Sequence, residues 1–179
     1  MKIIGKNSLL YWAKYPFLIY TVLFVFSSVW ICSLIVYYLA TGTLNSLINK
    51  GTANSANIIQ FRYPLSEMVL ATKNSTEGIL LAFFGIVSIC FVMIYAYRII
   101  KQLASDAIFT NTIVSDFRIM GTGLIIFGII TPLIDLTIER NTFNYTPSLL
   151  YVVTGFILLF VKEIFAQGKT LQDQTDLTI

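Results

Sequence analysis

The chain has 179 residues, of which 56% are hydrophobic and 12% are charged, and its mean hydropathy is +0.78. A water-soluble domain carries about 25% charged residues, because it must cover itself with polar surface. The composition is therefore that of a membrane protein, with one domain over residues 1–179. A net charge of +3 and the absence of histidine argue against a nucleic-acid-binding surface and exclude Ser-His or Cys-His catalysis.

The first long apolar run covers residues 16–40 and exceeds the roughly 20 residues that cross a hydrocarbon core. A cleaved signal peptide is the alternative, because Lys2, Lys6 and Lys14 precede the run. The apolar region of a signal peptide, however, has only about 7 to 15 residues. The run is therefore predicted to be a spanning helix, with Pro16 in its first turn.

Three further apolar runs follow. The second and third predict helices at about 79–101 and 111–138, both close to the required length. The fourth, about 145–166, is interrupted near its end by Lys162 and Glu163, where long side chains can reach the membrane interface. The predicted fold is an all-α integral membrane protein, a bundle of four transmembrane helices.

The basic residues are unevenly divided between the two ends of these helices. One side holds Lys2, Lys6, Lys14, Arg98, Lys101, Arg118, Lys162 and Lys169. The other side holds Lys50, Arg62, Lys73 and Arg140. Because basic residues favour the cytoplasmic side, both termini are predicted to be cytoplasmic.

The predicted outer loop, residues 41–78, is the only connection large enough for a small folded element. Ile59, Phe61 and Tyr63 alternate with polar residues, and the pattern stops at Pro64. Such alternation predicts a short strand or hairpin. A sensing surface and a partly ordered connector are the alternatives for this loop.

Small residues recur along the predicted helices at spacings that keep them on one face. Because helices in lipid associate through close packing, these positions are candidate helix contacts. They are Gly78, Ala82, Gly85, Gly121, Gly128 and Gly155.

Few charged residues lie within the predicted spans. Asp135, three residues after Pro132, is a candidate intramembrane polar site, with either a structural role or a role in binding a ligand, ion or proton. At the inner interface, Arg118 and Glu163 are predicted to form an ion pair, and Arg98 is the competing partner. The alternative is that Arg98, Arg118 and Glu163 are solvated side chains that anchor their helices at the membrane interface.

Two inner segments are candidates for binding a partner. The first is an elbow, residues 105–111, in which Thr110 can cap the third helix while Phe109 and Val114 form a hydrophobic staple. The second is a predicted cytoplasmic tail, residues 167–179, in which Gly168 is a residue type that often ends a helix. Packing beneath the bundle is the alternative for the tail. The candidate partner-binding residues are Phe109, Thr110, Leu171, Asp173, Asp176, Leu177 and Ile179.

The sequence offers little for catalysis. Cys32 and Cys90 fall within predicted helices, where a thiol behaves as a small apolar side chain. No glycine-rich phosphate loop is present. We therefore expect no metal site, no cofactor, no disulfide and no enzymatic activity.

A resemblance to a known family is carried by Phe109-Thr110, by the segment Asp116-Phe117-Arg118-Ile119-Met120-Gly121, and by residues 163–179. These segments resemble the bacterial four-helix membrane proteins grouped as domain-of-unknown-function family 2975. The family tail reads Glu-Ile-Phe, then Gly, then Leu-x-x-Glu-x-Asp-Leu-Thr-Ile. Here Gln174 stands in place of the glutamate, and Phe117 replaces the usual leucine of the elbow motif.

The resemblance implies a multi-pass protein of the bacterial inner membrane. It also implies a partner, since genes of this family often neighbour a small Cro/C1-type helix-turn-helix regulator. The leading hypothesis is a non-enzymatic protein that signals to or holds such a regulator through its elbow and tail, without contacting nucleic acid itself. The alternative is a small transporter, channel or immunity-type protein that uses Asp135 and Glu163, and an intramembrane enzyme ranks third. The expected partners are the lipid bilayer and the regulator. Whether the chain forms a homo-oligomer is left undecided.

Overall fold

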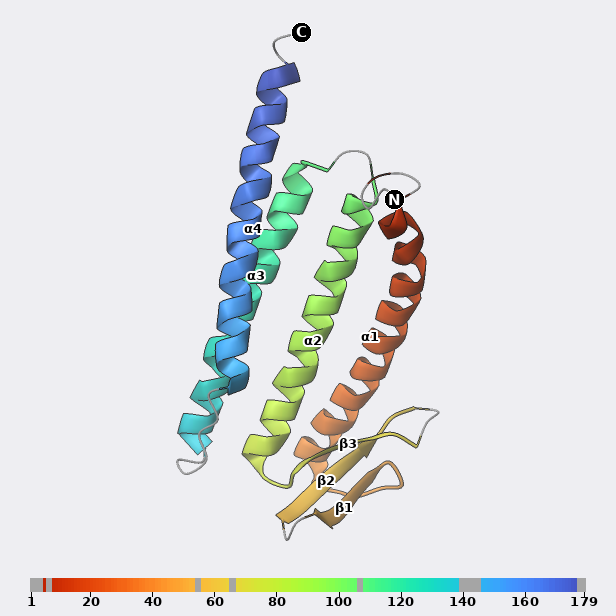
Figure 1. Cartoon of the computed structure of the whole chain (residues 1–179). Helices are drawn as coiled ribbons and strands as arrows, with labels where there is room; N and C mark the ends of the chain where they lie inside the picture. The colour runs from red at the N-terminus through yellow and green to blue at the C-terminus, as the bar shows by residue number, and fades with distance from the viewer. Residues whose placement is uncertain are drawn as a thin grey trace. The chain divides into compact units, whose positions relative to one another are not determined.

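The computed structural model describes residues 5, 8–53, 56–64, 67–105, 108–138 and 146–176. These residues form four helices and one sheet (Figure 1). The helices are α1 (Leu9–Thr41), α2 (Thr76–Leu103), α3 (Asn111–Ile138) and α4 (Thr146–Asp176). The strands are β1 (Ile48–Ala53), β2 (Ala56–Arg62) and β3 (Val69–Lys73). All four helices are long and apolar enough to cross a membrane.

Helix α1 begins earlier than predicted. Its first turn starts at Leu9, because the hydroxyl of Ser8 accepts a hydrogen bond from the amide of Tyr11 at 3.2 Å and so caps the helix. Pro16 therefore lies inside α1, and the prediction that it occupies the first turn is wrong.

Helix α4 continues further than predicted. Its regular structure runs to Asp176, so Gly168 does not end the helix, and most of the predicted tail is helical. The surrounding Gln167 and Lys169 are good helix formers, and Gly168 lies against an aromatic ring where a larger residue would not fit. The tail is thus an extension of α4.

The loop between α1 and α2 contains a three-stranded antiparallel sheet in the order β1-β2-β3, so the all-α class is wrong for this segment. The alternation around Ile59 and Phe61 is indeed that of a strand, as predicted. Phe61 stands opposite Ile48 of β1 and Leu70 of β3. Because side chains alternate along a strand, Ile59 and Phe61 share one face, which is buried.

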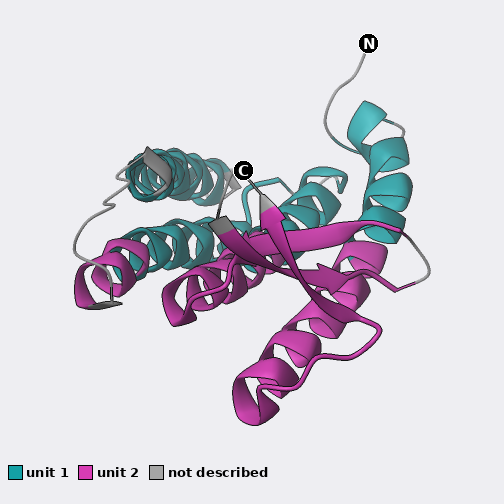
Figure 2. Ribbon diagram, turned by 90° about the horizontal axis from the view of Figure 1, so that it is seen from below, with its two compact units in different colours: residues 1–21, 91–130, 144–179 teal, residues 22–90, 131–143 magenta. Residues whose placement is uncertain are grey.

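The contacts within the chain divide it into two compact units (Figure 2), whereas one domain was expected. Unit 1 comprises residues 1–21, 91–130 and 144–179. Unit 2 comprises residues 22–90 and 131–143. The sheet belongs to unit 2, and the elbow belongs to unit 1.

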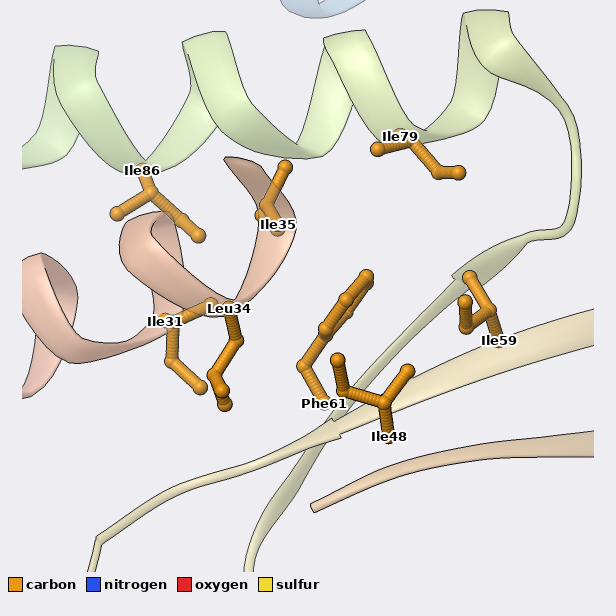
Figure 3. Packing of buried hydrophobic residues seen from close by; sticks show 8 residues of the cluster. All are labelled: Ile31, Leu34, Ile35, Ile48, Ile59, Phe61, Ile79 and Ile86. Atoms are coloured by element: carbon orange, nitrogen blue, oxygen red, sulfur yellow. The ribbon is translucent and has the colours of Figure 1, made fainter. Parts of the chain in front are cut away.

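Unit 2 contains a cluster of buried apolar side chains, which we call the sheet core. Its members come from α1, the sheet and α2, and all are less than 10% exposed. They are Ile31, Leu34, Ile35, Ile48, Ile59, Phe61, Ile79 and Ile86. Figure 3 shows Phe61 and Ile48 extending from the strands toward the side chains of α1. The ring of Tyr38 meets Phe61 edge to face, with 6.3 Å between centroids.

Unit 1 contains a second apolar cluster, formed by Ile99 of α2 with Ile113, Phe117 and Met120 of α3. Side chains of α4 cover it. The ring of Phe165 lies 5.2 Å from that of Phe117, measured between centroids.

Close approach of α3 and α4 depends on glycines. A Cβ on Gly121 would lie 2.8 Å from the carbonyl oxygen of Gly155, and a Cβ on Gly155 would lie 2.7 Å from that of Gly121. A Cβ on Gly128 would likewise lie 2.7 Å from Cγ2 of Val152. These three positions therefore serve the predicted role in packing.

The predicted glycines of α2 behave differently. Nothing lies within 4 Å of a Cβ placed on Gly85, so the described residues bring no neighbouring helix against it, and its packing role stays a prediction. Gly78 instead lies against the backbone of Lys73, in the turn that enters α2. Ala82 is partly buried.

Candidate functional site

The elbow joins α2 to α3, and its residues 105 and 108–111 are described by the structure. The hydroxyl of Thr110 accepts a hydrogen bond from the amide of Ile113 at 3.3 Å, so Thr110 caps α3 as predicted. The same hydroxyl donates to Oε1 of Gln102 at 3.3 Å. At the end of α2, the Ser105 hydroxyl donates to the carbonyl oxygen of Gln102 at 2.6 Å.

A buried carboxylate lies beside this elbow. The side chain of Asp116 is fully buried and accepts a hydrogen bond on Oδ2 from Nε2 of Gln102 at 2.7 Å. Nη2 of Arg98 lies 2.8 Å from Oδ1, although the angle is not that of a hydrogen bond. The guanidinium also lies 5.2 Å from the ring centroid of Tyr95. We call Arg98, Gln102 and Asp116 the elbow network.

The predicted ion pair between Arg118 and Glu163 is wrong. Glu163 is 58% exposed and pairs with its neighbour Lys162 at 2.7 Å, while Arg118 is exposed. Residues two apart on a helix point about 200° away from each other, so with Asp116 facing inward Arg118 faces outward. Arg98, the competing partner, pairs with Asp116 instead.

Sequence reasoning did not single out Asp116 as a charged partner. An acidic residue near the start of a helix is ordinarily explained by the helix dipole. A signal was nevertheless present, because Asp116 stands three residues after Ile113 and four before Met120, on the apolar side of α3. A carboxylate that is buried on this apolar side of α3 requires a hydrogen-bonding or oppositely charged partner.

The elbow contacts the extension of α4. The rings of Phe109 and Phe165 lie 5.6 Å apart between centroids, and a Cβ on Gly168 would lie 2.5 Å from Cε1 of Phe109. Nζ of Lys169 donates a hydrogen bond to Oδ1 of Asn111 at 2.6 Å. These contacts bring together the two segments that the sequence singles out for partner binding.

The candidate partner-binding residues differ in exposure. Phe109 is 39% exposed, Leu171 is 64% exposed and the Asp173 side chain is 62% exposed. Thr110 is partly buried by its capping role. Of the others, Asp176 is the last residue of α4, and Leu177 and Ile179 lie outside the described residues.

A cleft of about 460 Å³ opens beside the elbow. Its lining includes Arg98 and Lys101 of α2 with the hydroxyls of Thr110 and Thr112. Arg98 and Lys101 are positively charged donors, so the cleft suits carboxylate or carbonyl oxygens, although the hydroxyl proton of Thr110 is already donated to Gln102.

The other polar candidate, Asp135, is 5% exposed within α3 and belongs to unit 2, whereas Glu163 belongs to unit 1. Cys32 and Cys90 are free thiols. In the part of the chain that the structure describes, no group of three or more carboxylates and cysteines could hold a metal ion. The role of Asp135 stays a prediction.

Comparison of the chain with protein-family models, with curated proteins and with solved structures finds no match. The resemblance to family 2975 therefore stays a prediction, carried by the elbow and by the end of α4.

Proposed function

We propose that this chain is a multi-pass protein of the bacterial inner membrane, with cytoplasmic termini, that holds a cytoplasmic protein partner or passes a signal to it. The four apolar helices and the uneven distribution of basic residues support insertion in this orientation. The observation that carries the partner hypothesis is the contact between the elbow and the extension of α4, through Phe109, Gly168 and the Lys169–Asn111 hydrogen bond.

The length of α4 supports a surface outside the membrane. Its 31 residues extend over about 45 Å, whereas a hydrocarbon core is about 30 Å thick. About ten residues therefore project beyond the core, and Figure 1 shows α4 continuing past the start of α3. Leu171 and Asp173 lie on this projection.

The chemistry of the projection favours a protein over lipid. A cytoplasmic membrane surface is negatively charged and attracts basic rather than acidic segments. Leu171 and Asp173 are both exposed and, two residues apart, face opposite sides of α4, so Leu171 suits an apolar groove while Asp173, 3.8 Å from Lys169, suits a basic group of the partner. The resemblance to family 2975 implies a helix-turn-helix regulator, a class of protein that carries basic surface. Lys101 and Thr112 of the nearby cleft would take carboxylate or carbonyl oxygens of the same partner.

Capture of a small Cro/C1-type helix-turn-helix regulator, the partner that the resemblance implies, tests the proposal. The full chain is solubilised in detergent and immobilised, and the affinity of the purified regulator is measured for the wild type, Leu171→Ser and Asp173→Asn. We expect at least about a tenfold loss for Leu171→Ser, the size expected of a central contact residue. Leu44→Ser is the matched control, because Leu44 is 49% exposed but lies before β1 in unit 2.

Substitutions are preferable to truncation after Gly168, since truncation would cut within α4. Unchanged affinity in the double variant Leu171→Ser/Asp173→Asn would remove the extension of α4 from the partner surface. No binding of the regulator by the wild type would reject this partner.

A second candidate function, a small transporter, channel or immunity-type protein, rests on the burial of Asp135 in α3 near Pro132. Glu163 supports it less, because that side chain is 58% exposed and paired with Lys162. Proton or solute flux into vesicles that carry the protein tests this function. Flux that is lost in Asp135→Asn supports it, whereas flux equal to that of empty vesicles rejects it.

A further inference from the structure

Helix α4 is packed on one side only. Gly155 lies against Gly121 of α3, and Lys169 donates to Asn111 of α3, so these two residues mark the packed side. In the apolar stretch of α4, 6% of the residues are buried, compared with 17% to 28% in the other three helices. Most of the surface of α4 is therefore left to be covered by something outside the chain.

The opposite side of α4 has a regular pattern of exposed side chains. They recur in two series with a spacing of seven residues, which is close to two helical turns, and so they form one stripe along the helix. We call this stripe the α4 seam. Its members are Leu150, Val153, Ile157, Phe160, Ile164, Gln167 and Leu171.

The α4 seam continues beyond the membrane-spanning part of the helix. Lipid can cover Ile157 and Phe160, but Leu171 lies on the part of α4 that projects past the hydrocarbon core, where it is 64% exposed. Three heptads separate Leu150 from Leu171, and an apolar repeat of this length and spacing is typical of a coiled coil.

The charged residues of α4 lie off the seam. Lys162, Lys169 and Asp176 follow Gly155 at seven-residue intervals, on the side of the helix opposite the seam. Water would accept charged side chains on any exposed face of the projecting part. An uncharged stripe at Gln167 and Leu171 therefore indicates a surface that another helix covers.

We propose that a second copy of this chain covers the α4 seam, so that two α4 helices pair in parallel as a left-handed coiled coil. Two copies inserted in the same orientation are related by a two-fold axis, so each seam residue meets its own counterpart. Isoleucine at 157 and 164, in one of the two series, favours two strands. The amide of Gln167 both donates and accepts, so the two glutamines can hydrogen-bond to each other.

The dimer rests on the insertion proposed above but not on the regulator. Leu171 can contact only one partner at a time, so a regulator that binds there competes with the second copy. The dimer is therefore tested without the regulator.

Oxidative cross-linking of single cysteines in bacterial membranes tests the seam. Cys32 and Cys90 are first replaced by alanine, and Leu171→Cys, Gln172→Cys and Asp173→Cys are then compared in that background. All three positions are exposed, so random collisions would cross-link them equally. We expect Leu171→Cys to give severalfold more product than the other two, at twice the 20.2 kDa mass of the chain.

A second substitution tests the membrane part of the seam. Ile157→Ala should lower the cross-linking of Leu171→Cys severalfold, because it removes seam contact two heptads away. Ile129→Ala is the matched control, since Ile129 of α3 is 51% exposed and Ile157 is 54% exposed. It should leave the cross-linking unchanged.

Equal cross-linking at the three positions, or none at any of them, overturns the dimer. Products at a mass other than twice that of the chain would assign the seam to a different protein and also overturn it. Insertion is checked separately, because a membrane-impermeant maleimide should label Gln172→Cys in inverted vesicles but not in intact spheroplasts. Labelling in spheroplasts would reject the proposed orientation, and the cross-linking pattern would still decide the dimer.

Discussion

The sheet core of unit 2 is filled by aliphatic and aromatic side chains, whereas the elbow of unit 1 is held by a buried carboxylate with two polar partners. Apolar packing has no required direction and tolerates changes that conserve volume. A buried carboxylate needs particular atoms at particular distances, and it is costly when one of them is lost. The two regions should therefore respond to different substitutions, the sheet core to lost volume and the elbow to lost partners.

The largest effect is expected in the sheet core. Phe61→Ala removes a ring that is 0% exposed and should destabilise unit 2 by about 3 to 5 kcal/mol, because the cavity adds to the lost transfer energy. Hydrogen exchange of the strand amides in detergent should rise sharply, while that of the elbow stays unchanged. Phe61→Leu, which keeps most of the volume, is the control. Equal exchange in the two variants would show that volume does not decide the stability of this core.

A somewhat smaller effect is expected at the elbow. Asp116→Ala removes the acceptor of Gln102 and the charge opposite Arg98, and should cost about 2 to 3 kcal/mol. The Gln102 bond supplies most of this, since Arg98 is 47% exposed and water screens its charge. Thermal unfolding and amide hydrogen exchange at the start of α3 measure this loss of stability.

Asp173→Asn is the matched control for loss of an acidic group, because the Asp173 side chain is 62% exposed. It should change stability by less than about 0.5 kcal/mol. Equal unfolding temperatures for Asp116→Ala and wild type would contradict the role given to the elbow network.

A third comparison concerns the glycines. Gly155→Ala places a methyl group against the Gly121 carbonyl and should cost about 1 to 3 kcal/mol through overpacking between α3 and α4. Gly85→Ala enters open space and should be neutral or stabilising by up to about 1 kcal/mol, since alanine favours helix. Thermal unfolding of both variants in the same detergent measures the two changes in stability. A larger loss for Gly85→Ala would mean that α2 has a packing partner at that position.

The smallest effect is expected from Glu163→Gln. Its pair with Lys162 is exposed, so its removal should change stability by less than about 0.5 kcal/mol. Arg118→Gln should be equally mild because the side chain is exposed. A loss of several degrees in unfolding temperature for both variants, with no further loss when they are combined, would restore the pair that the sequence predicted.

Much of the fold follows from local sequence. Long apolar runs predict the four helices, and α3 matches its predicted limits of 111–138. Thr110 caps α3 because a hydroxyl at that position needs only the amide three residues later. The helix ends at Leu9 and Asp176 were missed, since a hydropathy threshold does not register polar residues that continue a helix.

The site was predictable only in part. Phe109 and the end of α4 were singled out from the sequence, but their contact through Gly168 was not, because nothing local shows which ring will lie over a glycine. Sequence also placed the inner ion pair on the wrong residues. The pairing of Arg98 with Asp116 depends on the rotation of two separate helices, which spacing along either one does not fix.

The sequence by itself determined that this chain has four membrane-length apolar helices and a strand around Ile59 and Phe61. Each of these depends on residues close together in the chain. Only the tertiary structure decided the three-stranded sheet, the burial of Asp116 with its partners, and the sheet core that joins the strands to α1 and α2. Those features join residues far apart in sequence, whose meeting is set by packing rather than by local preference.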